Sequence, residues 1–116
     1  MYEYNATMIN VVDGDTFDFD IDLGFSISHR IRVRLFGVDT PEIYHPRNKL
    51  EHAHGIEAKE FVEEYFLGKT GILKTVQDKK GKYGRYLADF IVKMDSGSNS
   101  LGNNLVSAGL SKKDNY

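Results

Sequence analysis

The sequence predicts an α+β domain, and a small closed β-barrel is the architecture that best accommodates its strands. Two stretches alternate between apolar and charged residues with the period of two that half-buried strands show. A third stretch repeats apolar residues at helical spacing, and two further apolar stretches follow it. The expected order is three strands, a helix, two strands and a short helix. No repeat or linker divides the chain, so residues 1–116 are expected to form one domain.

The N-terminal elements are the clearest. Residues 4–12 contain several β-branched and apolar residues and predict a first strand. In residues 17–22 phenylalanine or isoleucine alternates with aspartate, so Asp18, Asp20 and Asp22 are expected on the solvated face of a second strand.

The middle of the chain changes its pattern twice. Residues 29–38 alternate isoleucine, valine or leucine with arginine and predict a third strand, which a short turn joins to the second as a hairpin. Residues 43–55 read as a long polar loop. Apolar residues then recur at helical spacing from Ala58 to Phe66, and Gly68 is expected to end that helix.

The C-terminal third predicts two strands and a helix. Residues 72–76 and 87–92 are apolar enough for strands, and a loop with two glycines lies between them. Residues 96–100 are expected to form a polar turn. A short helix is predicted from Leu101, with Gly109 at its end.

Composition excludes several classes of protein. The 41% hydrophobic and 28% charged residues are ordinary for a globular domain. No apolar run approaches the roughly 20 residues that span a bilayer, so no membrane partner is expected. There is no cysteine, hence no disulfide and no thiolate site. The N-terminus has no signal peptide, which favours a cytoplasmic location unless the chain is a trimmed mature form.

Asp13 and Asp15 flank Gly14 where the first strand ends and the second begins. Asp-Gly is a common turn pair, so this stretch alone favours a turn over a catalytic site. A calcium loop of the EF-hand type over residues 18–29 is excluded, because its turn glycine would fall at Leu23 and its bidentate glutamate at His29.

A second acidic cluster favours a functional interpretation of Asp13 and Asp15 over a plain turn. Asp39, Thr40 and Glu42 directly follow the arginine-bearing strand. Two strand ends rich in oxygen ligands suit a hard cation such as calcium. Arg34 lies five residues before Asp39, and its planar fork fits phosphate oxygens. Acids for a metal and arginines for a phosphate together indicate phosphoryl-transfer chemistry.

The loop DKKGKYGRY at residues 78–86 completes this pattern. Lys82 adds positive charge, Tyr83 offers a stacking surface for a base, and Arg85 offers a second guanidinium. In isolation a solvated lysine-rich hairpin explains the loop equally well. Its coincidence with the two acidic clusters makes it informative.

At this point the sequence resembles the staphylococcal nuclease (thermonuclease) family. The matching stretches are VVDGDT at 11–16, RLFGVDTPE at 34–42, GIEAKEF at 55–61, DKKGKYGRYLA at 78–88 and NLVSAGL at 104–110. The resemblance covers nearly the whole chain. It implies a five-stranded barrel of the oligonucleotide-binding type with flanking helices, here without the usual C-terminal helix. It also implies a calcium-dependent nuclease that cleaves DNA and RNA and leaves 3′-phosphate ends.

By position in the matching motifs, the resemblance assigns Asp15 and Asp39 as calcium carboxylates and Thr40 as a backbone carbonyl ligand. Asp13 then supports the turn or lies one shell further out. Glu42 corresponds to the acid that positions or deprotonates the attacking water.

The same resemblance assigns Arg34 and Arg85 to charge neutralisation on the phosphate in the transition state. Tyr83, with Lys82 beside it, corresponds to the nucleotide pocket. The expected partner is single-stranded or locally melted DNA or RNA, and a single barrel of this kind is most simply a monomer.

Two features set this chain apart from the family pattern. The net charge of −2 contrasts with the strongly basic members of the family and predicts weaker, more salt-sensitive substrate binding. The loop around His45, His52 and His54 is histidine-rich, although three loop histidines are more often solvated than metal-bound.

A non-catalytic nucleic-acid-binding module of the same barrel type is the main alternative function. Such a module has no need of acids that face a phosphate, because without a metal they repel it. A protein-interaction domain that keeps only the fold is a third reading, and it predicts an exposed apolar patch.

Overall fold

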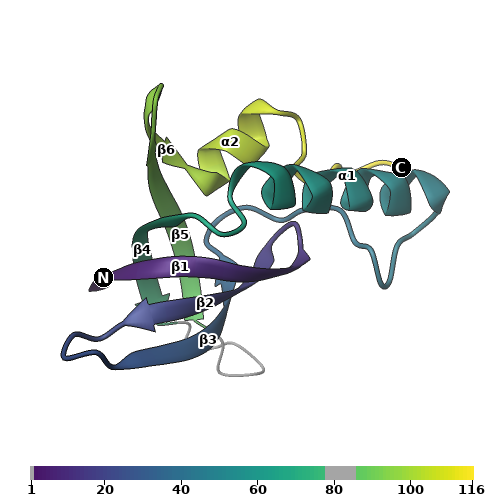
Figure 1. Ribbon diagram of the computed structural model, residues 1–116. Coiled ribbons are helices and arrows are strands. Elements are labelled where there is room, and N and C mark those ends of the chain that lie inside the picture. The colour runs from purple at the N-terminus through teal and green to yellow at the C-terminus, as the bar shows by residue number, and fades with distance from the viewer. Residues whose placement is uncertain (1, 78–85) are drawn as a thin grey trace.

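The computed structural model describes residues 2–77 and 86–116 (Figure 1). Its elements, in chain order, are β1 (Tyr2–Asp13), β2 (Thr16–Asp22), β3 (Ser28–Leu35), α1 (Lys49–Tyr65), β4 (Thr70–Gln77), β5 (Tyr86–Met94), β6 (Gly97–Ser100) and α2 (Leu101–Ser107). Neither described helix is long and apolar enough to cross a membrane.

The strands form one sheet in the order β3-β2-β1-β4-β5-β6. A parallel pairing of β3 with β5, in which Val33 lies opposite Tyr86 and Leu35 opposite Ala88, closes the first five into a barrel. All other neighbours are antiparallel. The result is a closed, mixed, five-stranded barrel of the oligonucleotide-binding type with two helices, as the sequence predicts.

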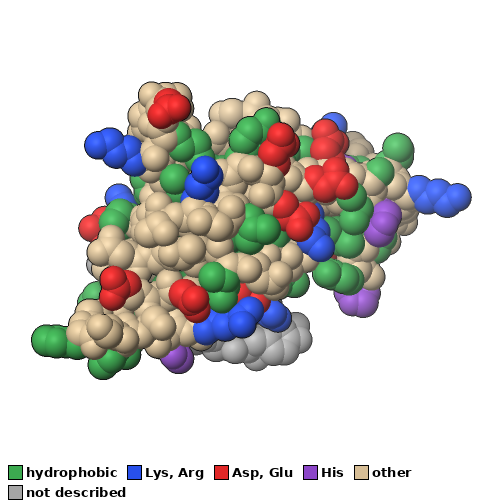
Figure 2. All heavy atoms as spheres, viewed as in Figure 1, with side chains coloured by type: hydrophobic (Ala, Val, Ile, Leu, Met, Phe, Trp, Pro, Cys, Tyr) green, Lys and Arg blue, Asp and Glu red, His purple; other side chains and the backbone are tan. Residues whose placement is uncertain are grey.

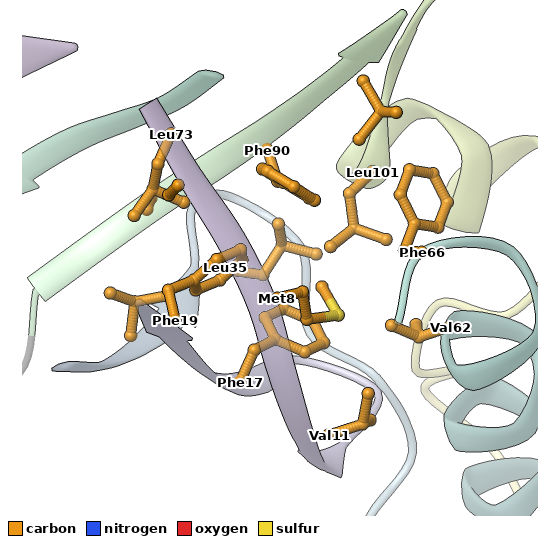
Figure 3. Close-up of a cluster of buried hydrophobic side chains, with 14 of the residues drawn as sticks. Met8, Val11, Phe17, Phe19, Leu35, Val62, Phe66, Leu73, Phe90 and Leu101 are labelled. Atoms are coloured by element: carbon orange, nitrogen blue, oxygen red, sulfur yellow. The ribbon is translucent and has the colours of Figure 1, made fainter. Parts of the chain in front are cut away.

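The alternation of β2 places its apolar residues inside the barrel. Phe17, Phe19 and Ile21 are buried, and the rings of Phe19 and Phe90 from β5 meet edge to face with centroids 4.8 Å apart. Figure 3 shows that Val62 and Phe66 at the end of α1 and Leu101 of α2 close this cluster from the helical side. Truncating one of these aromatic residues to alanine is expected to cost about 3–5 kcal/mol.

The second face of β2 differs from its prediction at one position. Asp20 and Asp22 are exposed, but Asp18 is only 5% exposed. Its carboxylate accepts hydrogen bonds from Arg32 Nε (2.8 Å), Arg32 Nη2 (3.2 Å) and Asn10 Nδ2 (3.0 Å). Alternation correctly places Asp18 outside the barrel, but the long arginine side chain of the neighbouring strand covers it there.

Helix α1 begins at Lys49, within the segment expected to be a polar loop. Asn48 caps it, because its side-chain oxygen accepts a hydrogen bond from the Glu51 amide at 3.0 Å. The buried face of α1 consists of Glu51, Gly55, Ala58 and Val62. Half of that face carries no hydrophobic side chain, so apolar periodicity detects only the second half of the helix.

The polar turn predicted at 96–100 is partly wrong, since Gly97–Ser100 form strand β6 and pair with β5. Gly97 has a φ of 112° and supplies the turn between them. Ser100 then caps α2, and its hydroxyl accepts a hydrogen bond from the Asn103 amide at 3.2 Å. Four residues without apolar alternation give no sequence signal for a strand.

Candidate active site

Two loops meet at one end of the barrel, below α1 in Figure 1. The first is the Asp13-Gly14-Asp15 turn between β1 and β2, and the second follows β3. Thr16 is the register partner of Arg34, and the amide of Leu35 donates a hydrogen bond to the Asp15 carbonyl at 2.7 Å. Strand pairing therefore brings the two separate acidic clusters of the sequence together.

Asp15 is the buried carboxylate of the site, at 7% exposure. Its Oδ2 accepts a hydrogen bond from the Thr40 amide at 3.1 Å, and its Oδ1 accepts one from the Thr16 hydroxyl at 3.3 Å. Burial is the main reason that the pKa of Asp15 rises to about 7, and the neighbouring Asp13 raises it further. The Thr40 amide and Arg34 act in the opposite direction. A cation beside Asp15 would favour its charged form.

Arg34 lies between two carboxylates. Its Nη2 is 2.5 Å from Asp39 Oδ1 and 3.8 Å from Asp15 Oδ2. Asp39 is largely exposed, so one side of the site is open to solvent and the other is walled by the buried Asp15. Positive charge is thus favoured at the point where the two strand ends meet.

Glu42 lies at the edge of this group. Its side chain is 42% exposed, and Oε1 is 4.0 Å from Lys112 Nζ. Burial acts to lower the pKa of Arg34, but Asp15, Asp39 and Glu42 together outweigh it, so the pKa lies above its ordinary value. The described chain therefore gathers Asp15, Arg34, Asp39, Thr40 and Glu42 around one location.

Gly14 has a role that its turn motif does not reveal. A Cβ at this position would lie 2.8 Å from Thr40 Oγ1 and 2.9 Å from the Cβ of Ala58 in α1. Glycine is needed here because the turn packs directly against the second loop and the helix. Close packing at Gly14 holds Thr40 against Asp15.

Lys82, Tyr83 and Arg85 lie outside the described residues, so their assignment remains a prediction. Strand β5 resumes the described chain at Tyr86, and Leu87 is the register partner of Arg34.

The donor set fits a hard cation such as calcium. The carboxylates of Asp15 and Asp39, which both lie within 4 Å of Arg34, are oxygen ligands of the kind that calcium prefers. Within residues 2–77 and 86–116, no group of three or more acid or imidazole side chains is placed to hold a metal. A cation here would therefore rely on two carboxylates, backbone oxygen and water.

His52 and His54, which were expected in a loop from the sequence, lie in helix α1. His52 Nδ1 lies 3.0 Å from the Ile43 carbonyl, and His54 bridges the Gly109 carbonyl (2.9 Å) and the Tyr116 hydroxyl (2.7 Å). Both rings tie α1 to neighbouring chain segments.

Sequence reasoning missed Glu51, which is fully buried beside this site. The signal that could have found it is Asn48 followed three residues later by a glutamate, the spacing of a helix capping box.

Comparison with known proteins shows the family to which the chain belongs. A sequence model of the family described as "Staphylococcal nuclease homologue" matches residues 32–116. An uncharacterized protein of Methanocaldococcus jannaschii is 33% identical over 86% of this chain and 53% of its own length. Thermonucleases of Staphylococcus hyicus and Staphylococcus intermedius are 33% and 37% identical over 74% and 67% of this chain, and 47% and 43% of their own lengths.

A closed, mixed, five-stranded barrel of the oligonucleotide-binding type with two helices defines the class of fold. The chain belongs to the staphylococcal nuclease family. It spans about half the length of the curated relatives that it matches.

Proposed function

We propose that this domain, acting as a monomer, is a calcium-dependent nuclease that hydrolyses DNA and RNA at the 5′-oxygen–phosphorus bond and leaves 3′-phosphate ends. The observation that carries the proposal is the contact of one guanidinium, Arg34, with both the buried Asp15 and the exposed Asp39. Acids and an arginine converging on one open location suit a metal-assisted attack on a phosphodiester.

Each side chain has a distinct task in this proposal. Asp15, Asp39 and the Thr40 carbonyl would hold calcium, which when bound withdraws charge from the phosphate and orients a water. Arg34 donates hydrogen bonds to a phosphate oxygen and exchanges its contact with Asp39 for that anion. Glu42 accepts a proton as the oxygen of water bonds to phosphorus and the bond to the 5′ oxygen breaks. Removing a donor such as Arg34 is expected to lower kcat about 100-fold or more.

The charge distribution supports local rather than broad binding of nucleic acid. The net charge is −2, and Figure 2 shows acidic side chains gathered over α1. That helix would repel a phosphate backbone, so a strand is expected to approach from the side of Arg34. The proposed partner is single-stranded or locally melted DNA or RNA, and its binding is expected to weaken as salt rises.

The direct test is cleavage of a single-stranded oligonucleotide in calcium, in chelator and with Arg34→Ala in calcium. Arg30→Ala is the matched control, since Arg30 lies on the same strand and is more exposed. Calcium-dependent cleavage to 3′-phosphate ends, lost in Arg34→Ala and kept in Arg30→Ala, is expected. Binding of the oligonucleotide without cleavage by a folded, calcium-bound chain would instead establish the non-catalytic binding module.

Calcium binding has a test that does not depend on activity. A ligand that binds only the folded chain raises the free energy of unfolding by about 2.7 kcal/mol at 100 times its Kd. Calcium is therefore expected to raise the urea midpoint of the wild type and to leave that of Asp39→Ala unchanged. Equal shifts in both proteins would remove Asp39 from the metal site.

A further inference from the structure

One buried carboxylate joins both ends of the loop that carries Glu42. Glu51 on the first turn of α1 is fully buried. Its Oε2 accepts a hydrogen bond from the Glu42 amide at 3.2 Å. Its Oε1 accepts from the Arg47 amide at 2.8 Å and from Arg47 Nε at 3.2 Å. The Glu51 side chain therefore binds both the first and the last backbone amide of the segment from Glu42 to Arg47.

A buried glutamate is costly unless its charge is paired and its lone pairs are satisfied. Capping of α1 does not account for it, because Asn48 already caps that helix. The carboxylate of Glu51 instead accepts hydrogen bonds from the loop. The Arg47 amide is the main reason that the pKa of Glu51 falls to about 2, so the group is ionised at neutral pH.

The next turns of α1 hold the same loop. His52 Nδ1 lies 3.0 Å from the Ile43 carbonyl. A Cβ on Gly55 would lie 2.7 Å from the Pro41 carbonyl oxygen and 3.1 Å from that of Glu42. The backbone on each side of Glu42 is therefore in direct contact with the helix.

Lys112 links the contacts of Glu51, here called the Glu51 clamp, to the backbone of Asp39. Its Nζ is 3.6 Å from Glu51 Oε2 and 4.0 Å from Glu42 Oε1. Its amide donates a hydrogen bond to the Asp39 carbonyl at 2.7 Å. The buried charge of Glu51 thus lies at the centre of contacts that reach both Asp39 and Glu42.

We infer that Glu51 is a positioning residue for hydrolysis: it fixes the backbone of Glu42 and so directs the Glu42 carboxylate towards the attacking water. This inference rests on the proposed nuclease function. Glu51 touches neither substrate nor metal in it and acts only through Glu42. Small displacements of a reacting group lower the rate of the chemical step steeply, while substrate binding changes little.

Glu51→Gln tests the inference. The amide side chain replaces one acceptor oxygen with an NH₂ group, so it cannot accept from Glu42 and Arg47 together. We expect kcat to fall about 10- to 100-fold with KM within about threefold, and the acidic limb of the kcat–pH profile to shift. Glu63→Gln, on the exposed face of the same helix, is expected to match the wild type in all three.

A second variant guards against simple loss of folding. Gly55→Ala leaves Glu51 intact but pushes the Pro41 and Glu42 carbonyls away from the helix, so it is expected to lower kcat in the same selective way. If folded Glu51→Gln and Gly55→Ala both keep the wild-type kcat and pH profile, Glu51 has a structural role only and the inference is overturned.

Hydrogen exchange separates this inference from the proposed function. Glu51→Gln is expected to speed exchange of the Glu42 amide, while Glu63→Gln leaves it unchanged. If the wild type is inactive but Glu51→Gln speeds exchange of the Glu42 amide, the nuclease proposal and the catalytic role of Glu51 are both wrong. The hold of Glu51 on the Glu42 backbone is then still supported. An active wild type whose Glu42 amide exchanges equally fast in both variants defeats the clamp alone.

Discussion

Gly14→Ala tests whether the Asp13-Gly14-Asp15 turn is held by close packing rather than by turn chemistry. The added methyl would lie 2.8 Å from Thr40 Oγ1, and 2.9 Å from the Cβ atoms of both Thr40 and Ala58. Cβ contacts below 3.0 Å are essentially never tolerated, so the turn, the loop or α1 must move. Thr40 and Ala58 are both buried, which leaves neither free to swing into solvent.

The size of the effect follows from this overpacking. Inserting one methyl into a well-packed site typically costs about 1–3 kcal/mol. The movement also separates the Thr40 amide from Asp15 Oδ2, which are 3.1 Å apart. Loss of such a supporting contact typically weakens a metal site about 10- to 100-fold. Gly14→Ala is therefore expected to lower both stability and calcium affinity.

The assay is urea unfolding with and without calcium, and Gly102→Ala is the matched control. A Cβ on Gly102 in α2 would meet Asp89 and Val38 at 3.6 Å, which is ordinary contact. Alanine is the better helix former by up to about 1 kcal/mol, so the control is expected to gain stability. A Gly14→Ala protein with the urea midpoint and calcium response of the wild type would refute the packing argument.

Three further predictions follow from single side chains. The buried hydroxyl of Thr40 has no hydrogen-bond partner among the described residues. Thr40→Val is therefore expected to raise the free energy of unfolding by about 1 kcal/mol and to keep cleavage activity. A lower free energy of unfolding would show that the hydroxyl has a partner. Phe25 on the β2–β3 turn is 98% exposed and has a φ of 52°, a left-handed conformation that asparagine tolerates better than phenylalanine. Phe25→Asn is therefore expected to raise the free energy of unfolding in urea by about 1 kcal/mol. No increase would mean that the ring makes a stabilising contact. The pKa of Glu51 falls from 4.5 to about 2 on folding, so ionised Glu51 stabilises the folded chain above pH 4.5, and this contribution is lost as the pH drops towards 2. Glu51→Gln is expected to flatten the curve of unfolding free energy against pH in that range. An unchanged slope would contradict the lowered pKa.

The exposed turn that carries Phe25 is also where an apolar patch is found. Leu23, Phe25 and Ile27 are all exposed there, and Figure 2 shows hydrophobic side chains projecting at the far left of the molecule, where Figure 1 places the β2–β3 turn. The protein-interaction reading of the sequence expects such a patch.

The sequence predicted the barrel well because period-two alternation is a local property. Phe17 and Phe19 needed only their immediate neighbours to be placed inside. That the strand ends carrying Asp15 and Asp39 form one site was predicted from their place in the strands and from the family motifs. Both kinds of signal are present in short stretches of sequence.

The features that were missed depend on contacts between distant segments. Asp18 is buried by the side chain of Arg32, which is 14 residues away. Glu51 lies in a polar stretch, and only the fold brings the amides of Glu42 and Arg47 to it. Gly14 is a turn residue in sequence and a packing residue in space. The capping-box spacing of Asn48 and Glu51 is a local signal for the helix start, but no local pattern shows which distant groups these residues contact.

The most direct test of the account is a comparison of Asp39→Asn with Asp20→Asn in a single-stranded DNA cleavage assay with calcium. Both changes remove one carboxylate charge from an exposed aspartate, but only Asp39 contacts Arg34. The account predicts that Asp39→Asn loses about 100-fold or more of the cleavage rate and that Asp20→Asn cleaves like the wild type. Equal rates in the two folded variants would contradict a phosphodiesterase site at the meeting point of Asp15, Arg34 and Asp39.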